Sequence, residues 1–204
     1  MSKNIGTDAN IARVRVAEQG SNPSTPATGF GYLFEKTDQS LYFLNASGTV
    51  IQLNTSALVQ RVSYQTGSFG TTTTAIPLDD TIPQNNEGSQ FMAVTIVPTN
   101  SGNNLYIDVT IWATISTAGW INVALFQDNV ASALSAAGIY IETATAGATV
   151  HLHYKMVAGT TSATTFKVRI GPYPSGTVTF NGNSGARLFG GVASSSIIVD
   201  EIKV

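Results

Sequence analysis

The stretch LYIDVTIWATI, residues 105–115, decides the fold of this chain. Its aliphatic residues stand at every second position, and Tyr, Asp, Thr and Trp fill the positions between them. Successive side chains of a β-strand point to opposite faces of a sheet, so a period of two separates the two sets cleanly. We therefore predict a long strand here, with its aliphatic face toward a core.

Similar alternation recurs on both sides of this strand. Further strands are predicted at residues 91–97, 121–125, 138–143, 150–156, 166–170, 176–180 and 196–203. Runs of Gly, Pro, Asn and Ser separate them, and from about residue 74 the spacing gives roughly eight or nine strands. This pattern predicts an all-β chain built on an antiparallel β-sandwich, and eight strands favour a jelly roll. Residues 128–137 are the only helical candidate, and a turn or loop fits them equally well.

The first 66 residues follow a different pattern. A strand is predicted around residues 12–16, a linker rich in Pro, Ser and Thr follows, and three short strands are predicted at residues 30–36, 41–44 and 49–53. A β-meander of this size has almost no core and is marginal alone in water, so it must pack against another surface. We predict an N-terminal attachment arm with a small meander at residues 1–66, and a sandwich at residues 67–204.

Composition excludes several classes of protein. Charged residues make up 11% of the chain, against roughly 25% in an ordinary globular domain. The basic residues are scattered, which argues against a nucleic-acid partner, and no apolar run reaches the ~20 residues of a membrane span. There is no cysteine and no N-terminal apolar signal segment, so we expect synthesis in a cytoplasm. A surface so poor in charge suits a protein partly buried against copies of itself.

Residues with catalytic or metal-binding chemistry are few. His151 and His153 lie two apart on one strand face and could share a metal, but Lys155 continues that face, and polar surface histidines are the simpler interpretation. Asp79 and Asp80 could form a glycosidase pair, yet neighbours on an extended chain point to opposite sides. No nucleophile elbow or phosphate loop is present. We therefore predict a non-enzymatic protein with no catalytic residue, no bound metal and no cofactor.

Aromatic residues provide candidate contacts. Trp112 and Trp120 flank a turn, and Tyr106 precedes Trp112 on the polar face of its strand. Such side chains stack on sugars or anchor protein interfaces, and packing against a neighbouring subunit is the interpretation we favour. These three residues, with His151 and His153, are the candidate trimer or glycan contacts.

The N-terminal segment supplies a second set of candidates. Arg13 and Arg15 share one face of the first predicted strand, where they either pair with acidic groups of a partner or form an exposed strand face. We name Arg13, Arg15, Tyr32 and Tyr42 as candidate partner-binding residues.

Two stretches carry a resemblance to a known group of proteins. PATGFGYLFEKTDQSLYFLNASGTVIQL, residues 26–53, resembles a segment of tailed-bacteriophage fibres and head-decoration proteins in which GYLYxKxDGxLYFKNxxGTxxxL precedes a globular head. SGARLFGGVASSSIIVDEI, residues 184–202, is similar to the last strand pair of fibre knobs and decoration heads. Gln39 stands where the pattern has a turn Gly, and no coiled-coil or collagen-like shaft is present.

This resemblance implies a homotrimer with a jelly-roll knob on the virion surface. A chain without a shaft fits a capsid decoration (cement) protein or short head fibre, which would bind the major capsid protein and stabilise the particle. A short tail fibre or receptor-binding knob that binds a tail protein and recognises a host surface glycan is the alternative. Both roles are binding roles and rest on analogy. Six histidines would meet if His151 and His153 lay at a threefold axis, which leaves a shared metal there open.

Overall fold

The computed structural model describes residue 16, residues 18–53 and residues 57–204. The chain divides into two compact units, one ending at Ser56 and the other running from Ala57 to Val204. The described chain is all-β, and its helical residues form one 3-10 turn, η1 (Phe189–Gly191). In the described stretches, no helix has the length and apolar character to cross a membrane.

The C-terminal unit is a jelly roll. Its eight main strands are β5 (Leu58–Thr66), β7 (Ser89–Ile96), β8 (Asn104–Ile115), β9 (Gly119–Gln127), β10 (Ser135–Ile141), β11 (Gly147–Val157), β12 (Thr164–Tyr173) and β16 (Ser195–Ile202). They pair in a nested, antiparallel order: β5 with β16, β7 with β12, β8 with β11 and β9 with β10. Of these eight strands, the first pairs with the eighth, the second with the seventh, the third with the sixth and the fourth with the fifth. This is the wrapping of a jelly roll, and it confirms the predicted fold class.

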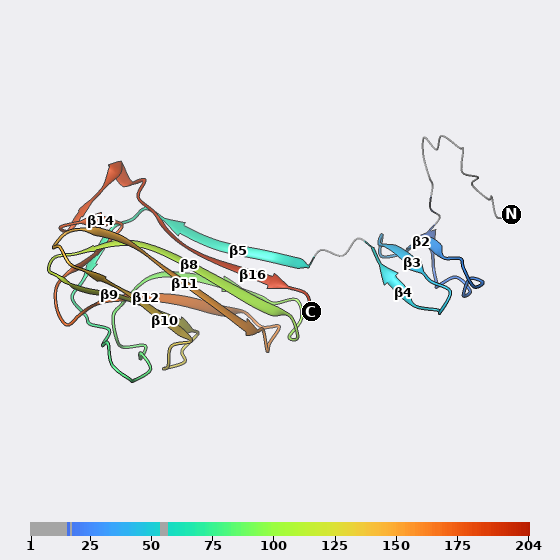
Figure 1. The fold of residues 1–204 in the computed structure, drawn as a ribbon, viewed down its shortest axis with the longest axis horizontal. Coiled ribbons are helices and arrows are strands. Elements are labelled where there is room, and N and C mark those ends of the chain that lie inside the picture. The colour runs from blue at the N-terminus through green and yellow to red at the C-terminus, as the bar shows by residue number, and fades with distance from the viewer. Residues whose placement is uncertain (1–15, 17, 54–56) are drawn as a thin grey trace. The chain divides into compact units, whose positions relative to one another are not determined.

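This nesting produces two facing sheets. One has the order β5-β16-β8-β11 and the other β7-β12-β9-β10, and Figure 1 shows the two layers. The short strands β6 (Gly70–Thr72) and β13 (Val178–Phe180) extend the first sheet beside the far end of β8. A separate two-stranded ribbon, β14 (Gly182–Asn183) with β15 (Ala186–Arg187), precedes η1.

The core lies between the two sheets and follows the predicted alternation. The inward side chains of β8, from Leu105 to Ile115, are each at most 1% exposed. They face the inward residues of β9 and β12, including Val123 and Phe166, which are fully buried. Because the inner faces are aliphatic or aromatic over most of their length, the jelly roll has an apolar core of its own.

Two sequence predictions are corrected here. The boundary predicted at residue 66 lies near residue 56, because β5 pairs with β16 inside the jelly roll. β5 was missed because it is an edge strand with exposed residues on both faces, which hides its alternation. The helical candidate at residues 128–137 is not a helix: residues 128–134 form a loop, the alternative that the sequence left open, and residues 135–137 begin β10.

The N-terminal unit is a small meander. Its strands are β1 (Glu18–Gln19), β2 (Tyr32–Lys36), β3 (Leu41–Leu44) and β4 (Val50–Gln52), with β1 parallel to β2 and the others antiparallel. Its buried core contains Phe34, Tyr42 and Leu44. Gln39 adopts a φ of 59° in the β2–β3 turn, the conformation that the pattern's Gly would hold without strain. Arg13 and Arg15 lie outside the described residues.

A buried carboxylate fastens the last strand of the jelly roll. Glu201 on β16 points into the core and accepts hydrogen bonds from the side chains of Gln60 (2.6 Å) and Asn103 (2.6 Å) and from the backbone N–H of Thr99 (2.9 Å). Burial alone would raise its pKa, but these hydrogen bonds outweigh burial and lower the pKa from 4.5 to about 2. Glu201 therefore stays ionised and ties β16 to β5 and to the loop before β8.

Candidate binding surfaces

Four of the five predicted trimer or glycan contacts lie on one outer sheet face. His153 on β11 is hydrogen-bonded through Nδ1 to Asp108 on β8, and His151 lies 3.2 Å from the hydroxyl of Thr110 in the next cross-strand pair. The half-buried ring of Trp112 on the same face packs over Gly147, where an added Cβ would lie 2.7 Å from the ring. The β8–β11 pairing thus brings together residues that the sequence placed on two separate strands.

Charges on this face are paired across strands. Lys155 Nζ lies 5.2 Å from the centroid of the Tyr106 ring. In the same cross-strand row, the Arg61 guanidinium donates two hydrogen bonds of 2.6 Å to Asp200, and its hydrogen bonds to that carboxylate raise the pKa of Arg61. Asp108 and Asp200 thus each have a basic partner within the subunit, while Lys155 contacts an aromatic ring. In the described chain, no three His, Cys, Asp or Glu side chains gather to hold a metal ion.

Trp120, the fifth candidate, lies on the other sheet. It stands on the outer face of β9, in register with Tyr140 on β10 and Tyr173 on β12. The rings of Trp120 and Tyr140 meet edge to face with centroids 5.6 Å apart, and Tyr140 is 50% exposed. We call Tyr140, Trp120 and Tyr173 the aromatic row.

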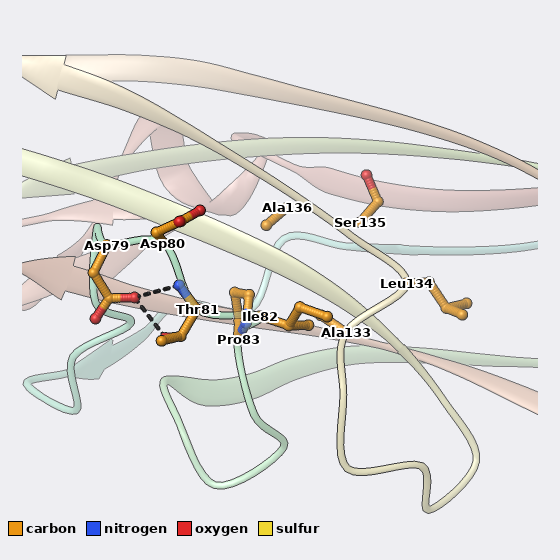
Figure 2. Close-up of a pocket in the computed structure, with 9 residues that line it drawn as sticks. All are labelled: Asp79, Asp80, Thr81, Ile82, Pro83, Ala133, Leu134, Ser135 and Ala136. Carbon is orange, nitrogen blue, oxygen red and sulfur yellow. Dashed lines mark hydrogen bonds between the residues drawn. The ribbon is translucent and has the colours of Figure 1, made fainter.

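A groove begins beside this row. One wall is the loop before β7, with Asp79, Asp80 and Thr81, and the other is the start of β10, with Ala136, as Figure 2 shows. Two adjoining hollows of about 380 and 250 Å³ share Asp79, Thr81, Pro83 and Ala136. We call them together the β10 groove.

The two carboxylates of the groove are held differently. Asp79 Oδ1 accepts a hydrogen bond of 2.8 Å from the backbone N–H of Thr81, and the hydrogen bonds from Thr81 lower the pKa of Asp79. Figure 2 shows the carboxylates of Asp79 and Asp80 turned in different directions. This arrangement provides acceptors for hydrogen bonds rather than a facing acid and nucleophile.

A buried amide forms the floor of the groove. Asn122 on β9 is 5% exposed, and its Nδ2 donates a hydrogen bond of 2.9 Å to the backbone oxygen of Ile76. Its Oδ1 has no hydrogen-bond partner, the one such buried side-chain atom in the described chain. Asn122 lies between Gly138 and Gly171 in register, and a Cβ on Gly138 would come within 2.2 Å of Oδ1. The glycine therefore leaves that oxygen uncovered by a side chain on the groove side.

The meander carries a third surface. The outer row of its sheet, Leu33, Phe43 and Ile51, is opposite the face that holds its core, and Leu33 and Ile51 are 47% and 46% exposed. Leu53 beyond them is 51% exposed. We call Leu33, Phe43, Ile51 and Leu53 the meander face. A continuous exposed apolar face on so small a unit is typical of a surface that binds another protein surface.

The two tyrosines predicted to bind a partner differ in position. Tyr32 is 44% exposed. Tyr42 stacks on Phe34, donates a hydrogen bond of 2.7 Å to Asp38, and lies under the ammonium of Lys36. Its ring is thus engaged within the meander.

No protein-family model and no curated protein matches this sequence.

Solved structures give distant likenesses. The chain is similar to the C-terminal domain of EclA, described as a sugar-binding protein, at 16% identity and a TM-score of 0.34, over 67% of this chain and 84% of that one. It is similar to a structure of infectious bursal disease virus, Gt strain, at 8% identity and 0.34, over 82% and 45%. It is similar to the enzymatically active domain of bacteriophage CBA120 tailspike protein 4 at 15% identity and 0.27, over 71% and 20%. At these scores the likeness carries no function from one protein to another.

Sequence reasoning missed the β10 groove and Asn122. The groove joins a loop, an edge strand and the floor of β9, and no local pattern predicts that these segments meet. A signal did exist for Asn122, which is polar within the apolar run of β9. The sequence also contained a signal for Glu201. This residue follows Ile197 and Val199 at a spacing of two, so its side chain points into the core.

Proposed function

We propose that this chain is a non-enzymatic structural protein of a phage virion surface, in which the N-terminal unit joins copies into a homotrimer. The observation that carries the proposal is the meander face: apolar, half exposed, and part of a unit whose core contains three buried side chains. The N-terminal unit, residues 1–56, is well below the ~70 residues at which a single core suffices, and units of this size usually add disulfides, metals or oligomerisation. The chain has no cysteine, and the described residues offer no metal-binding group, so association supports the meander best.

Placement on a virion is supported by the resemblance of residues 26–53 to attachment segments of phage fibres and decoration proteins. The proposed partners are other copies of the chain and the major capsid protein or a tail protein, with no nucleic acid and no membrane. Three copies of a weak contact bind a repetitive particle surface far more tightly than one copy, because the second and third contacts become intramolecular. Trimerisation and attachment are therefore coupled.

The test is rebinding to particles from which the protein has been removed. Wild-type protein is expected to co-sediment with the particles, whereas Leu33→Ser/Ile51→Ser is expected to stay in the supernatant. The matched control, Val157→Ser/Val192→Ser, removes apolar side chains that are 55% and 80% exposed on the jelly roll and is expected to rebind. Equal rebinding by all three proteins would contradict the proposal.

A short tail fibre or receptor-binding knob that recognises a host surface glycan is the second candidate, and the aromatic row with its exposed Tyr140 favours it. Copy number separates the two roles. A decoration protein is expected at hundreds of copies per particle on a stained gel of purified virions, and a fibre at a few.

A further inference from the structure

We infer that the β10 groove and the aromatic row together form a binding site for a neutral saccharide. The site belongs to the jelly-roll unit alone. It does not depend on the proposed attachment role, and its test is independent of the oligomeric state.

The described lining of the groove has hydrogen-bond acceptors and no basic side chain. Asp79 and Asp80 line it, and neither Lys nor Arg does so among the described residues. Asp79 uses Oδ1 to hold Thr81, while its Oδ2 accepts no hydrogen bond in the described chain. A ligand rich in hydroxyl donors matches this lining, whereas a phosphate, sulfate or carboxylate would be repelled.

The floor contributes a further acceptor. The unpartnered Oδ1 of the buried Asn122 lies on the side of Gly138, which lines the groove. A buried polar atom without a partner costs free energy, and a donor that reaches it recovers that cost. Because that oxygen is itself buried beside Gly138, a hydroxyl group at the groove floor would reach it once the Asn122 amide turns toward the groove.

The aromatic row supplies the other half of sugar recognition. The ideal Cβ position of Gly138 is 3.4 Å from the Trp120 ring, so the ring lies directly beside the groove floor. Tyr140 extends this platform toward solvent. A pyranose has apolar C–H faces and hydroxyl edges, so one face can stack on the ring while the hydroxyls reach the acceptors.

A strand from another protein is the competing occupant. It would pair with the free edge of β10 and would need neither the carboxylates nor the Trp120 ring. The acceptors and the ring lie on the sheet face instead, and for this reason the saccharide is the occupant we infer.

Two tryptophans make the test direct. Trp112→Phe leaves Trp120 as the only tryptophan, and Trp120→Phe leaves Trp112, on the other sheet, as the matched control. Full-length variants are titrated with glucose, galactose and N-acetylglucosamine, and with N-acetylneuraminic acid as the acidic comparator. We expect a saturable change in Trp120 emission with at least one neutral sugar, at least ten-fold weaker binding of the acidic sugar, and no change in Trp120→Phe.

Blocking variants locate the site. Ala136 is exposed on the outer face of β10, so Ala136→Phe fills the groove without entering the core, and Thr149→Phe adds the same ring to an exposed position of β11. Ala136→Phe is expected to weaken binding at least ten-fold and Thr149→Phe to leave it unchanged, with both folds checked by circular dichroism. Asp79→Asn/Asp80→Asn is expected to reduce the preference for neutral over acidic sugar.

Four results would overturn the inference: no saturable change with any neutral sugar, an equal change in Trp120→Phe, tighter binding of the acidic sugar, or unchanged binding by Ala136→Phe. If the wild-type protein binds an added β-strand peptide but no sugar, and Ala136→Phe no longer binds that peptide, the groove is a site for a strand of another protein.

Discussion

The jelly-roll unit packs two inner sheet faces against each other, whereas the meander of residues 32–52 buries one sheet face and leaves the other exposed. Both are antiparallel β-structures from the same charge-poor chain. The jelly roll fastens its ends with buried polar contacts such as those of Glu201, while the meander has a core of Phe34, Tyr42 and Leu44. The two units therefore differ in how much apolar surface each buries, and the proposed association concerns the smaller one.

The largest effect is expected from truncating the jelly-roll core. Phe166 is fully buried between the sheets, so Phe166→Ala should lower the free energy of unfolding by about 3–5 kcal/mol, measured by urea denaturation. Phe34→Ala removes the same ring from the meander core and should leave the jelly-roll transition in place while it abolishes association. A loss of the jelly-roll transition in Phe34→Ala would show that the two units fold as one.

The second effect concerns Glu201 and pH. Its pKa in the folded protein, about 2, lies below the ordinary value of 4.5, so its stabilisation is fully present above about pH 4.5 and is lost as the pH falls toward 2. We expect a loss on the order of 3 kcal/mol over this window. Glu201→Gln should cost about 2–3 kcal/mol at neutral pH and flatten this acid dependence, because a neutral amide cannot replace the carboxylate acceptor. An unchanged acid profile in thermal unfolding would contradict the role given to Glu201.

A smaller effect should distinguish glycines in the two units. An added Cβ at Gly171 would lie 2.5 Å from the backbone oxygen of Thr74, so Gly171→Ala must displace the loop over β9 and should cost about 1–3 kcal/mol. Gly20→Ala in the N-terminal unit has no atom within 4 Å of the new Cβ and should leave stability unchanged. Thermal unfolding of both variants checks the difference, and equal midpoints would refute the close packing at Gly171.

The smallest effect is expected in the meander turn. Gln39 holds a φ of 59°, so Gln39→Gly should relieve strain and stabilise the assembled protein by at most about 1 kcal/mol. Ser47→Gly, in the next turn, loses the hydrogen bond that the Ser47 hydroxyl donates to Asn45 Oδ1 and should not stabilise it. A lower thermal-unfolding midpoint for Gln39→Gly than for Ser47→Gly would contradict the strain assigned to Gln39.

The sequence predicted those parts of the fold that depend on local alternation. β8, with every second residue aliphatic, was recognisable because one of its faces is buried along its whole length. β5 was not, because an edge strand buries too little of either face. Sites assembled across strands were harder still: His153 and Asp108 meet through the β8–β11 register, and Trp112 and Trp120, close in sequence, lie on opposite sheets. Register and sheet order are properties of the whole chain, which local patterns do not contain.

The central claim is that the meander face holds three copies together, and light scattering at micromolar concentration tests it most directly. The full chain should give three times its 21.4 kDa mass, and Leu33→Ser/Ile51→Ser should give 21.4 kDa with the jelly roll still folded. A folded wild-type monomer of 21.4 kDa, or a trimer that survives the double substitution, would contradict the claim.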